Sequence, residues 1–231
     1  MDYIPVIYWV SLFIGGGSLS ALTFMVSIIH YPSIINILTF SPMSSLFLVF
    51  TLINTPLLTF VFYHTFSFYQ KSRSRVSPNV LPKYDFLVKS FLLCGAIFVA
   101  SILLMMFFKP QNEIELHYLF IVSFSMSAVS FSYLSDFIYA MISKMMIPLS
   151  MTINHILCSV TAVTYILCLF SHKSKIIKIL FGFLQIISFS LYYSKIFFLG
   201  VTCLGARFLD VQIDLLSKHQ QTILPSSFNS A

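Results

Sequence analysis

The feature that most constrains this chain is the recurrence of long apolar stretches along nearly its whole length. Hydrophobic residues make up 58% of its 231 residues and charged residues only 9%, whereas roughly a quarter of the residues of a soluble domain are charged. A helix needs about 20 apolar residues to cross the hydrocarbon core of a bilayer. Because such stretches follow one another along the chain, we expect an all-α, polytopic membrane protein.

The apolar stretches predict a bundle of six transmembrane helices. The predicted spans are 7–29, 45–69, 86–108, 117–143, 147–170 and 179–208. They form a single transmembrane domain, 1–212, and we expect the polar tail, 213–231, to be cytoplasmic. The first stretch has no basic residue before Trp9 and no small-residue cleavage site, so we interpret it as a retained helix and not as a signal peptide.

Prolines and charges mark the connections between the predicted spans. Residues 30–42 contain Pro32 and Pro42 but no Asp, Glu, Lys or Arg, which indicates a loop at the membrane interface. Residues 71–83 are the most basic and most polar stretch, and we predict a flexible loop there. Within the second span, Pro56 removes a backbone hydrogen bond and predicts a helix kink.

The distribution of Lys and Arg predicts that both termini are cytoplasmic. Cytoplasmic segments carry an excess of these residues. With a cytoplasmic N-terminus, the cytoplasmic side holds Lys71, Arg73, Arg75, Lys83, Lys144, Arg207 and Lys218, and the other side holds Lys109, Lys173, Lys175 and Lys178. Anionic lipids beside the basic loops account for the net charge of +6, so no nucleic-acid partner is expected.

Two ionisable residues within predicted spans are candidates for a functional or structural role. Asp136 lies in the fourth span and Lys195 in the sixth. Buried charges are rare in membrane helices because they are expensive to desolvate. Helix tilt could bring the two together as an interhelical ion pair; structural pairing or snorkelling to the interface is the more common role of such residues.

Histidines are the other candidates for chemistry. His64, His117 and His155 lie in different spans and share no HxxxH or HxxE spacing, so no metal site is predicted. Neither a GxSxG motif nor a phosphate-binding glycine loop is present in the sequence, and no cofactor is expected. From the residues alone, an enzymatic activity is left open.

Short motifs spread from about Pro5 to Gln212 carry a family resemblance. They are Tyr31-Pro32-Ser33-Ile34 followed by Pro42, Asn54-Thr55-Pro56 with Phe60 and Tyr63-His64, Ile114-Glu115-Leu116-His117 leading into Phe120 to Phe124, and Phe208-Leu209-Asp210-Val211-Gln212. Their order resembles the post-GPI-attachment-to-proteins factor two family, which is related to the damage-regulated autophagy modulators. Leu57 stands where the family has an arginine, so the chain resembles a divergent member.

The resemblance implies six helices with cytoplasmic termini, residence in Golgi or endoplasmic reticulum membranes, and a role in remodelling the lipid of GPI anchors. The implied partners are membrane lipids, including the GPI-anchor lipid. The family places a histidine at the non-cytoplasmic mouth of its fourth helix, which corresponds to His117 here. If the chain is itself an acyltransferase, His117 is the candidate catalytic base, because acyl transfer needs a group that takes the hydroxyl proton.

Three other functions are compatible with the sequence. A non-enzymatic protein of the autophagy-modulator branch would act through partners in lysosomal or plasma membranes. A divergent chemosensory receptor would have seven spans, whereas six are predicted. A transporter would use Asp136 and Lys195 as coupling groups, although no repeat relates the first three spans to the last three.

Overall fold

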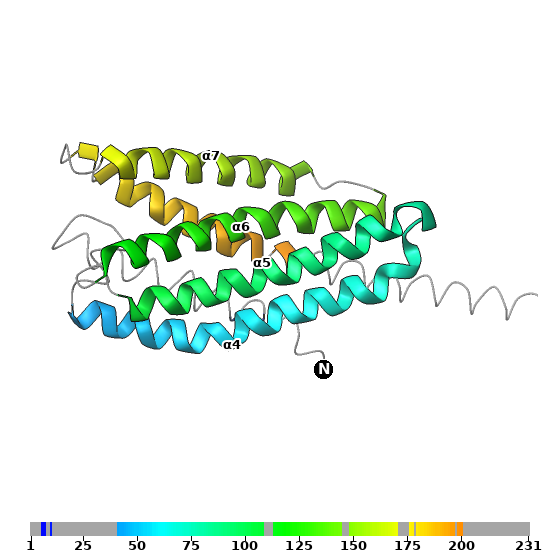
Figure 1. Ribbon diagram of the computed structural model, residues 1–231, viewed down its shortest axis with the longest axis horizontal. Helices are drawn as coiled ribbons and strands as arrows, with labels where there is room; N and C mark the ends of the chain where they lie inside the picture. The colour runs from blue at the N-terminus through cyan, green and yellow to red at the C-terminus, as the bar shows by residue number, and fades with distance from the viewer. Residues whose placement is uncertain are drawn as a thin grey trace, which may run out of the picture.

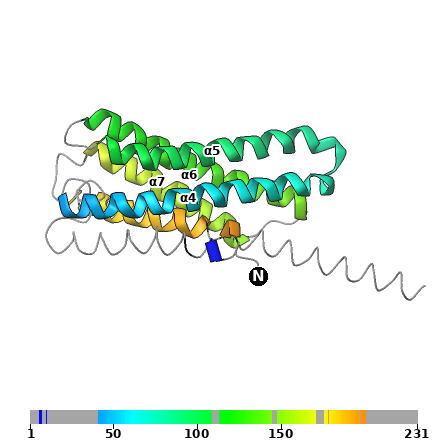
Figure 2. The ribbon, with the colours of Figure 1, turned by 90° about the horizontal axis from the view of Figure 1, so that it is seen from below.

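A computed structural model gives the architecture of the chain, and it describes residues 6–7, 10, 41–108, 113–144, 148–170, 176–177, 179–196 and 198–200. Nearly all of the described residues are helical, and none of them forms a strand. The long helices are α4 (Ser41–Lys71), α5 (Leu81–Phe107), α6 (Ile114–Ser143), α7 (Pro148–Phe170) and a last helix, Ile179–Gly200. They run side by side along the long axis of the bundle (Figures 1 and 2).

Five helices in the described part of the chain are long and apolar enough to cross a membrane. Their spanning segments are Ser44–Arg75, Pro78–Phe107, Glu115–Ser143, Leu149–Leu167 and Ile179–Gly200. Helices suit this environment because they satisfy their own backbone hydrogen bonds where lipid offers none. The five segments coincide with predicted spans two to six. Nearly all of the first predicted span, 7–29, lies outside the described residues, as do residues 201–208 and the tail 213–231.

Several helices begin earlier than the sequence predicted. Helix α4 begins at Ser41, so Pro42 lies in a first turn and not in a loop; proline is tolerated there because the first N–H groups of a helix have no intrahelical partner. Helix α6 begins at Ile114, although its span was predicted from residue 117. Hydropathy marks the apolar part of a helix and misses polar turns that extend beyond it.

Helix α4 continues without a break through Pro56. The Thr55 hydroxyl donates to the Thr51 carbonyl at 2.7 Å, one turn back along the helix. The chain therefore remains helical on both sides of the proline, and the kink at Pro56 stays a prediction.

The connection between α4 and α5 is not the flexible loop that the sequence predicted. It forms two 3₁₀ turns, η2 (Ser72–Arg75) and η3 (Pro78–Val80). The Ser72 hydroxyl donates to the Phe68 carbonyl at 3.0 Å. The Arg73 guanidinium donates two hydrogen bonds to the Asp85 carboxylate, each at 2.9 Å. Charged residues that look like a solvated loop in the sequence here close a tight helical hairpin.

Phenylalanine rings fill the centre of the bundle between α4, α5 and α6. The Phe62 ring contacts Phe91, Phe98 and Phe131, with its centroid 4.9 Å from that of Phe131 in an edge-to-face geometry. Gly95 of α5 allows this packing, because a Cβ atom at residue 95 would lie 2.6 Å from the Phe62 ring. Helix α5 thus sits close against both of its neighbours.

Candidate functional site

A polar cluster joins α6, α7 and the last helix inside the bundle. The Lys195 ammonium donates to the Asp136 carboxylate at 2.7 Å and also to the Ser150 hydroxyl. Asp136 accepts two further hydrogen bonds, from the Ser150 hydroxyl at 2.8 Å and from the Asn154 amide at 2.5 Å. The structure therefore forms the interhelical ion pair that the sequence left open.

Burial explains why the two charges of this cluster are paired. Lys195 is 1% exposed and the Asp136 side chain 13% exposed. An unpaired charge at the centre of a membrane helix costs about 2.5–3.5 kcal/mol by insertion measurements. Pairing removes the net charge, and the Ser150 hydroxyl and the Asn154 amide N–H donate further hydrogen bonds to the carboxylate. The Asn154 amide oxygen is buried without a hydrogen-bond partner. The cluster can hold three helices together, and its two charges neutralise each other.

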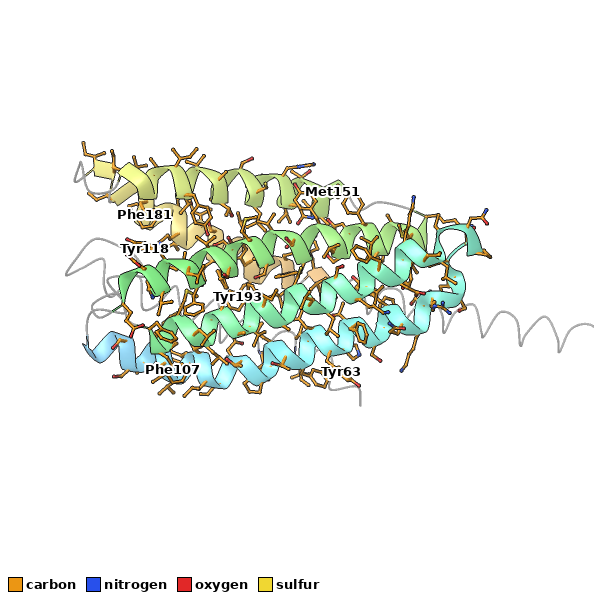
Figure 3. The ribbon with its side chains drawn as sticks, in the orientation of Figure 1. Tyr63, Phe107, Tyr118, Met151, Phe181 and Tyr193 are labelled. Carbon is orange, nitrogen blue, oxygen red and sulfur yellow. The ribbon has the colours of Figure 1, made fainter. Side chains whose placement is uncertain are left out.

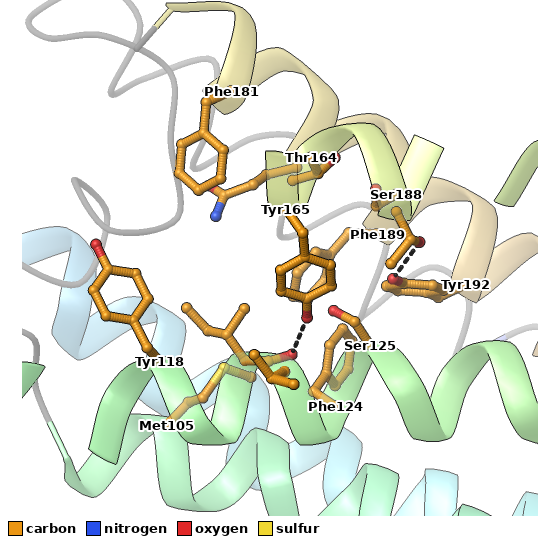
Figure 4. Close-up of a pocket in the computed structure, with 14 residues that line it drawn as sticks. Met105, Tyr118, Phe124, Ser125, Thr164, Tyr165, Phe181, Ser188, Phe189 and Tyr192 are labelled. Atoms are coloured by element: carbon orange, nitrogen blue, oxygen red, sulfur yellow. Dashed lines mark hydrogen bonds between the residues drawn. The ribbon is translucent and has the colours of Figure 1, made fainter. Parts of the chain in front are cut away.

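A cavity of about 440 Å³ lies between the same helices, nearer the start of α6. Its wall is formed by Met105 of α5, residues 118–125 of α6, residues 161–165 of α7 and residues 181–192 of the last helix (Figure 4). This volume falls within the roughly 300–1,000 Å³ typical of small-ligand sites. The cavity was not predicted from the sequence.

The lining of the cavity is uncharged and mostly apolar, with six aromatic rings among its 14 residues. None of the 14 lining residues is Asp, Glu, Lys, Arg or His. Among the lining residues, the Thr161 hydroxyl lies 3.1 Å from the Tyr192 hydroxyl, and the Tyr165 hydroxyl donates to the Ile121 carbonyl at 3.1 Å. The Ser188 hydroxyl is buried without a hydrogen-bond partner. An uncharged, largely apolar group such as an acyl chain fits this chemistry.

His117 is fully buried in the first turn of α6. Its Nδ1 lies 2.9 Å from the Phe108 carbonyl oxygen, which can only accept, so Nδ1 carries the hydrogen. Its Nε2 has no hydrogen-bond partner. His117 does not line the cavity, although the next residue, Tyr118, does. This geometry gives His117 a clear role in fixing the α5–α6 connection, and its role as a catalytic base stays a prediction.

The other two candidate histidines, His64 and His155, belong to neither feature. His155 is exposed, with Nδ1 3.0 Å from the Tyr133 hydroxyl, and the His64 ring stacks on Phe60. Across the described ranges, no three His, Cys, Asp or Glu residues gather closely enough to hold a metal ion.

Ser150 and Asn154 are the site residues that the sequence reasoning missed. They are one turn apart on α7 and point to the same carboxylate, that of Asp136. The signal was present: two polar residues at a spacing of four in an apolar span share one face, and such a face needs a polar neighbour.

Comparison of the chain with family models, with curated proteins and with solved structures finds no match.

Proposed function

We propose that this chain is a six-span membrane protein that acts in the lipid remodelling of GPI anchors, in Golgi or endoplasmic reticulum membranes and with both termini in the cytoplasm. The cavity between α6, α7 and the last helix is the observation that carries the proposal. The motif resemblance supplies the reaction context, and the cavity supplies a place for an acyl chain.

The chemistry of the cavity favours the acyl part of a lipid over its headgroup. Its lining offers aromatic and aliphatic surface with a few neutral hydroxyl and amide groups and no charge. A phosphate or sugar headgroup would lose its hydration there without an ionic partner. The lipid would therefore bind with a chain in the cavity and its headgroup outside, near the start of α6.

Deleting the gene and restoring it tests the function. Loss should leave lyso-type GPI lipids and lower the amount of GPI-anchored protein at the cell surface, and the intact chain should restore both. GPI-anchor lipids are measured by mass spectrometry and the surface proteins by flow cytometry. Unchanged lipids and unchanged surface levels would contradict the proposal and would favour the autophagy-modulator alternative.

Variants that fill the cavity link this function to the site. Ser125→Leu and Ser188→Leu add bulk at two lining residues, whereas Ser159→Leu adds the same bulk on the exposed face of α7. We expect the first two variants to restore GPI remodelling poorly and Ser159→Leu to restore it fully, at matched expression. Full activity of both cavity variants would mean that GPI remodelling does not depend on the cavity.

A further inference from the structure

The α4–α5 connection presents basic side chains at one end of the bundle. Lys71, Arg73, Arg75 and Lys83 are all exposed, and nitrogen-tipped side chains gather around this end in Figure 3. Lys144, which directly follows α6, is exposed as well. Helix α6 contacts η2, so Lys144 belongs to the same end of the bundle. We call these five residues the basic cap.

The backbone beneath the basic cap is held in place by local contacts. The Val76 side chain is buried, and its N–H bonds the Arg73 carbonyl at 3.2 Å. The buried Tyr84 hydroxyl donates to the Tyr69 carbonyl at 2.5 Å, which fastens the start of α5 to the end of α4. A ligand that binds here meets a preformed surface and does not have to order a loop first.

In the described part of the chain, no acidic side chain pairs with Lys71, Lys83 or Lys144. Asp85 pairs with Arg73 at the surface, and Asp136, the nearest acid inside α6, is occupied by Lys195. Lys71 ends a membrane-spanning helix and Lys83 begins another, so both lie where lipid headgroups meet the protein. Positive charge at this depth attracts anionic lipids, with each lysine or arginine contributing a several-fold preference.

We propose that the basic cap is a binding surface for the phosphate-bearing headgroups of anionic phospholipids in the leaflet that this end of the bundle meets. The cap is separate from the acyl-chain cavity, and its function does not depend on GPI remodelling. Anionic lipids at the cap would contact Lys71, Lys83 and Lys144, which belong to three different helix ends, while Arg73 stays paired with Asp85.

Competition between two phospholipids with identical acyl chains tests the cap. The purified full chain in detergent is mixed with equal amounts of phosphatidylserine and phosphatidylcholine, and native mass spectrometry counts the bound lipids. Because the chains are identical, binding in the cavity adds the two lipids equally and cannot create a preference. We expect a clear preference for phosphatidylserine, and we expect the variant K71Q/K83Q/K144Q to reduce that preference by about 10-fold or more.

The control variant K173Q/K175Q/K178Q removes the same charge from the connection that follows α7, and it should keep the preference. The single variant K83Q, with a loss of about threefold, serves if the triple variant folds poorly. Inorganic phosphate at matched ionic strength should not displace the lipid. Displacement by phosphate, an equal loss in the control, or a wild-type ratio near one would each overturn the proposal.

Discussion

At the scale of single residues, the Lys195 ammonium is the group whose burial most needs an explanation. The Asp136 carboxylate is its only charged partner in the described part of the chain, and Ser150 and Asn154 complete the contacts. Removing one charge of such a pair leaves the other buried and unpaired, which costs more than the pair itself contributes. The exposed Arg73–Asp85 pair at the basic cap lacks this property, because water solvates either partner alone.

The first prediction concerns the cost of leaving one charge of the buried Asp136–Lys195 pair without its partner. Asp136→Leu and Lys195→Leu should each lower the free energy of unfolding by about 3 kcal/mol, and the double variant should be more stable than either single one. Unfolding of the purified chain in mixed micelles gives the three values. Asp85→Asn is the control and should change stability much less. Additive losses in the double variant would contradict a coupled pair.

The second prediction separates two roles of His117. If its Nδ1–H only anchors the Phe108 carbonyl, then His117→Gln, which retains an N–H donor, should keep both folding and GPI remodelling, whereas His117→Ala should lose stability by about 1 kcal/mol. If His117 is the base for acyl transfer, both variants lose remodelling while His117→Gln remains folded. Thermal unfolding and GPI-lipid analysis of the two variants distinguish the outcomes, and normal remodelling by His117→Ala would exclude the base.

At the scale of elements, the third prediction rests on the approach of α4 to α5. Gly95→Ala would place a methyl group 2.6 Å from the Phe62 ring, which is enclosed by other rings and has little room to move. Overpacking of this kind typically costs 1–3 kcal/mol, so we expect a loss of about 2 kcal/mol. Phe62→Leu should relieve part of that loss in the double variant. Ala96→Leu, on the exposed face of α5, is the matched control; equal thermal stability of Gly95→Ala and the wild type would contradict the packing.

The helices also show which parts of the fold could be predicted from the sequence. Apolar stretches long enough to cross a bilayer located α4 to α7 and the last helix, because hydropathy over about 20 residues is a strong signal. The helix starts at Ser41 and Ile114 were missed, since short stretches that contain a proline or a charge can form a helical turn that hydropathy does not register. The 3₁₀ turns between α4 and α5 were also missed. The Arg73–Asp85 contact joins residues 12 positions apart, and a local sequence pattern does not reveal such a contact.

The candidate site was predictable only in part, and for a related reason. Asp136 and Lys195 stood out because charge inside an apolar span is rare. Their meeting, and the cavity between residues 118–125 and 181–192, depend on how three helices pack, which a linear pattern does not contain.

At the scale of the whole molecule, short connections between consecutive helices fix which ends of the bundle lie together. Helices α4 and α5 are joined by the basic cap, and α6 and α7 are joined by a few residues after Lys144 at the same end. The connections after α5 and after α7 therefore lie at the other end. If residues 7–29 also cross the membrane, the N-terminus lies on the side of the basic cap. The side of the N-terminus thus distinguishes six spans from five.

The fourth prediction uses this parity. The sequence contains no N-glycosylation acceptor, Asn-x-Ser/Thr with x other than proline. Any glycan on a variant must therefore be attached at the inserted acceptor. Acceptors with a flexible spacer are placed at the N-terminus and within 71–83, 109–113 and 171–178. We expect the Lys and Arg residues of the basic cap to hold that end in the cytoplasm. Glycans are then expected only at 109–113 and 171–178, on the opposite side. A glycan at the N-terminus together with none at 71–83 would mean that residues 7–29 do not cross, and the bundle would have five spans.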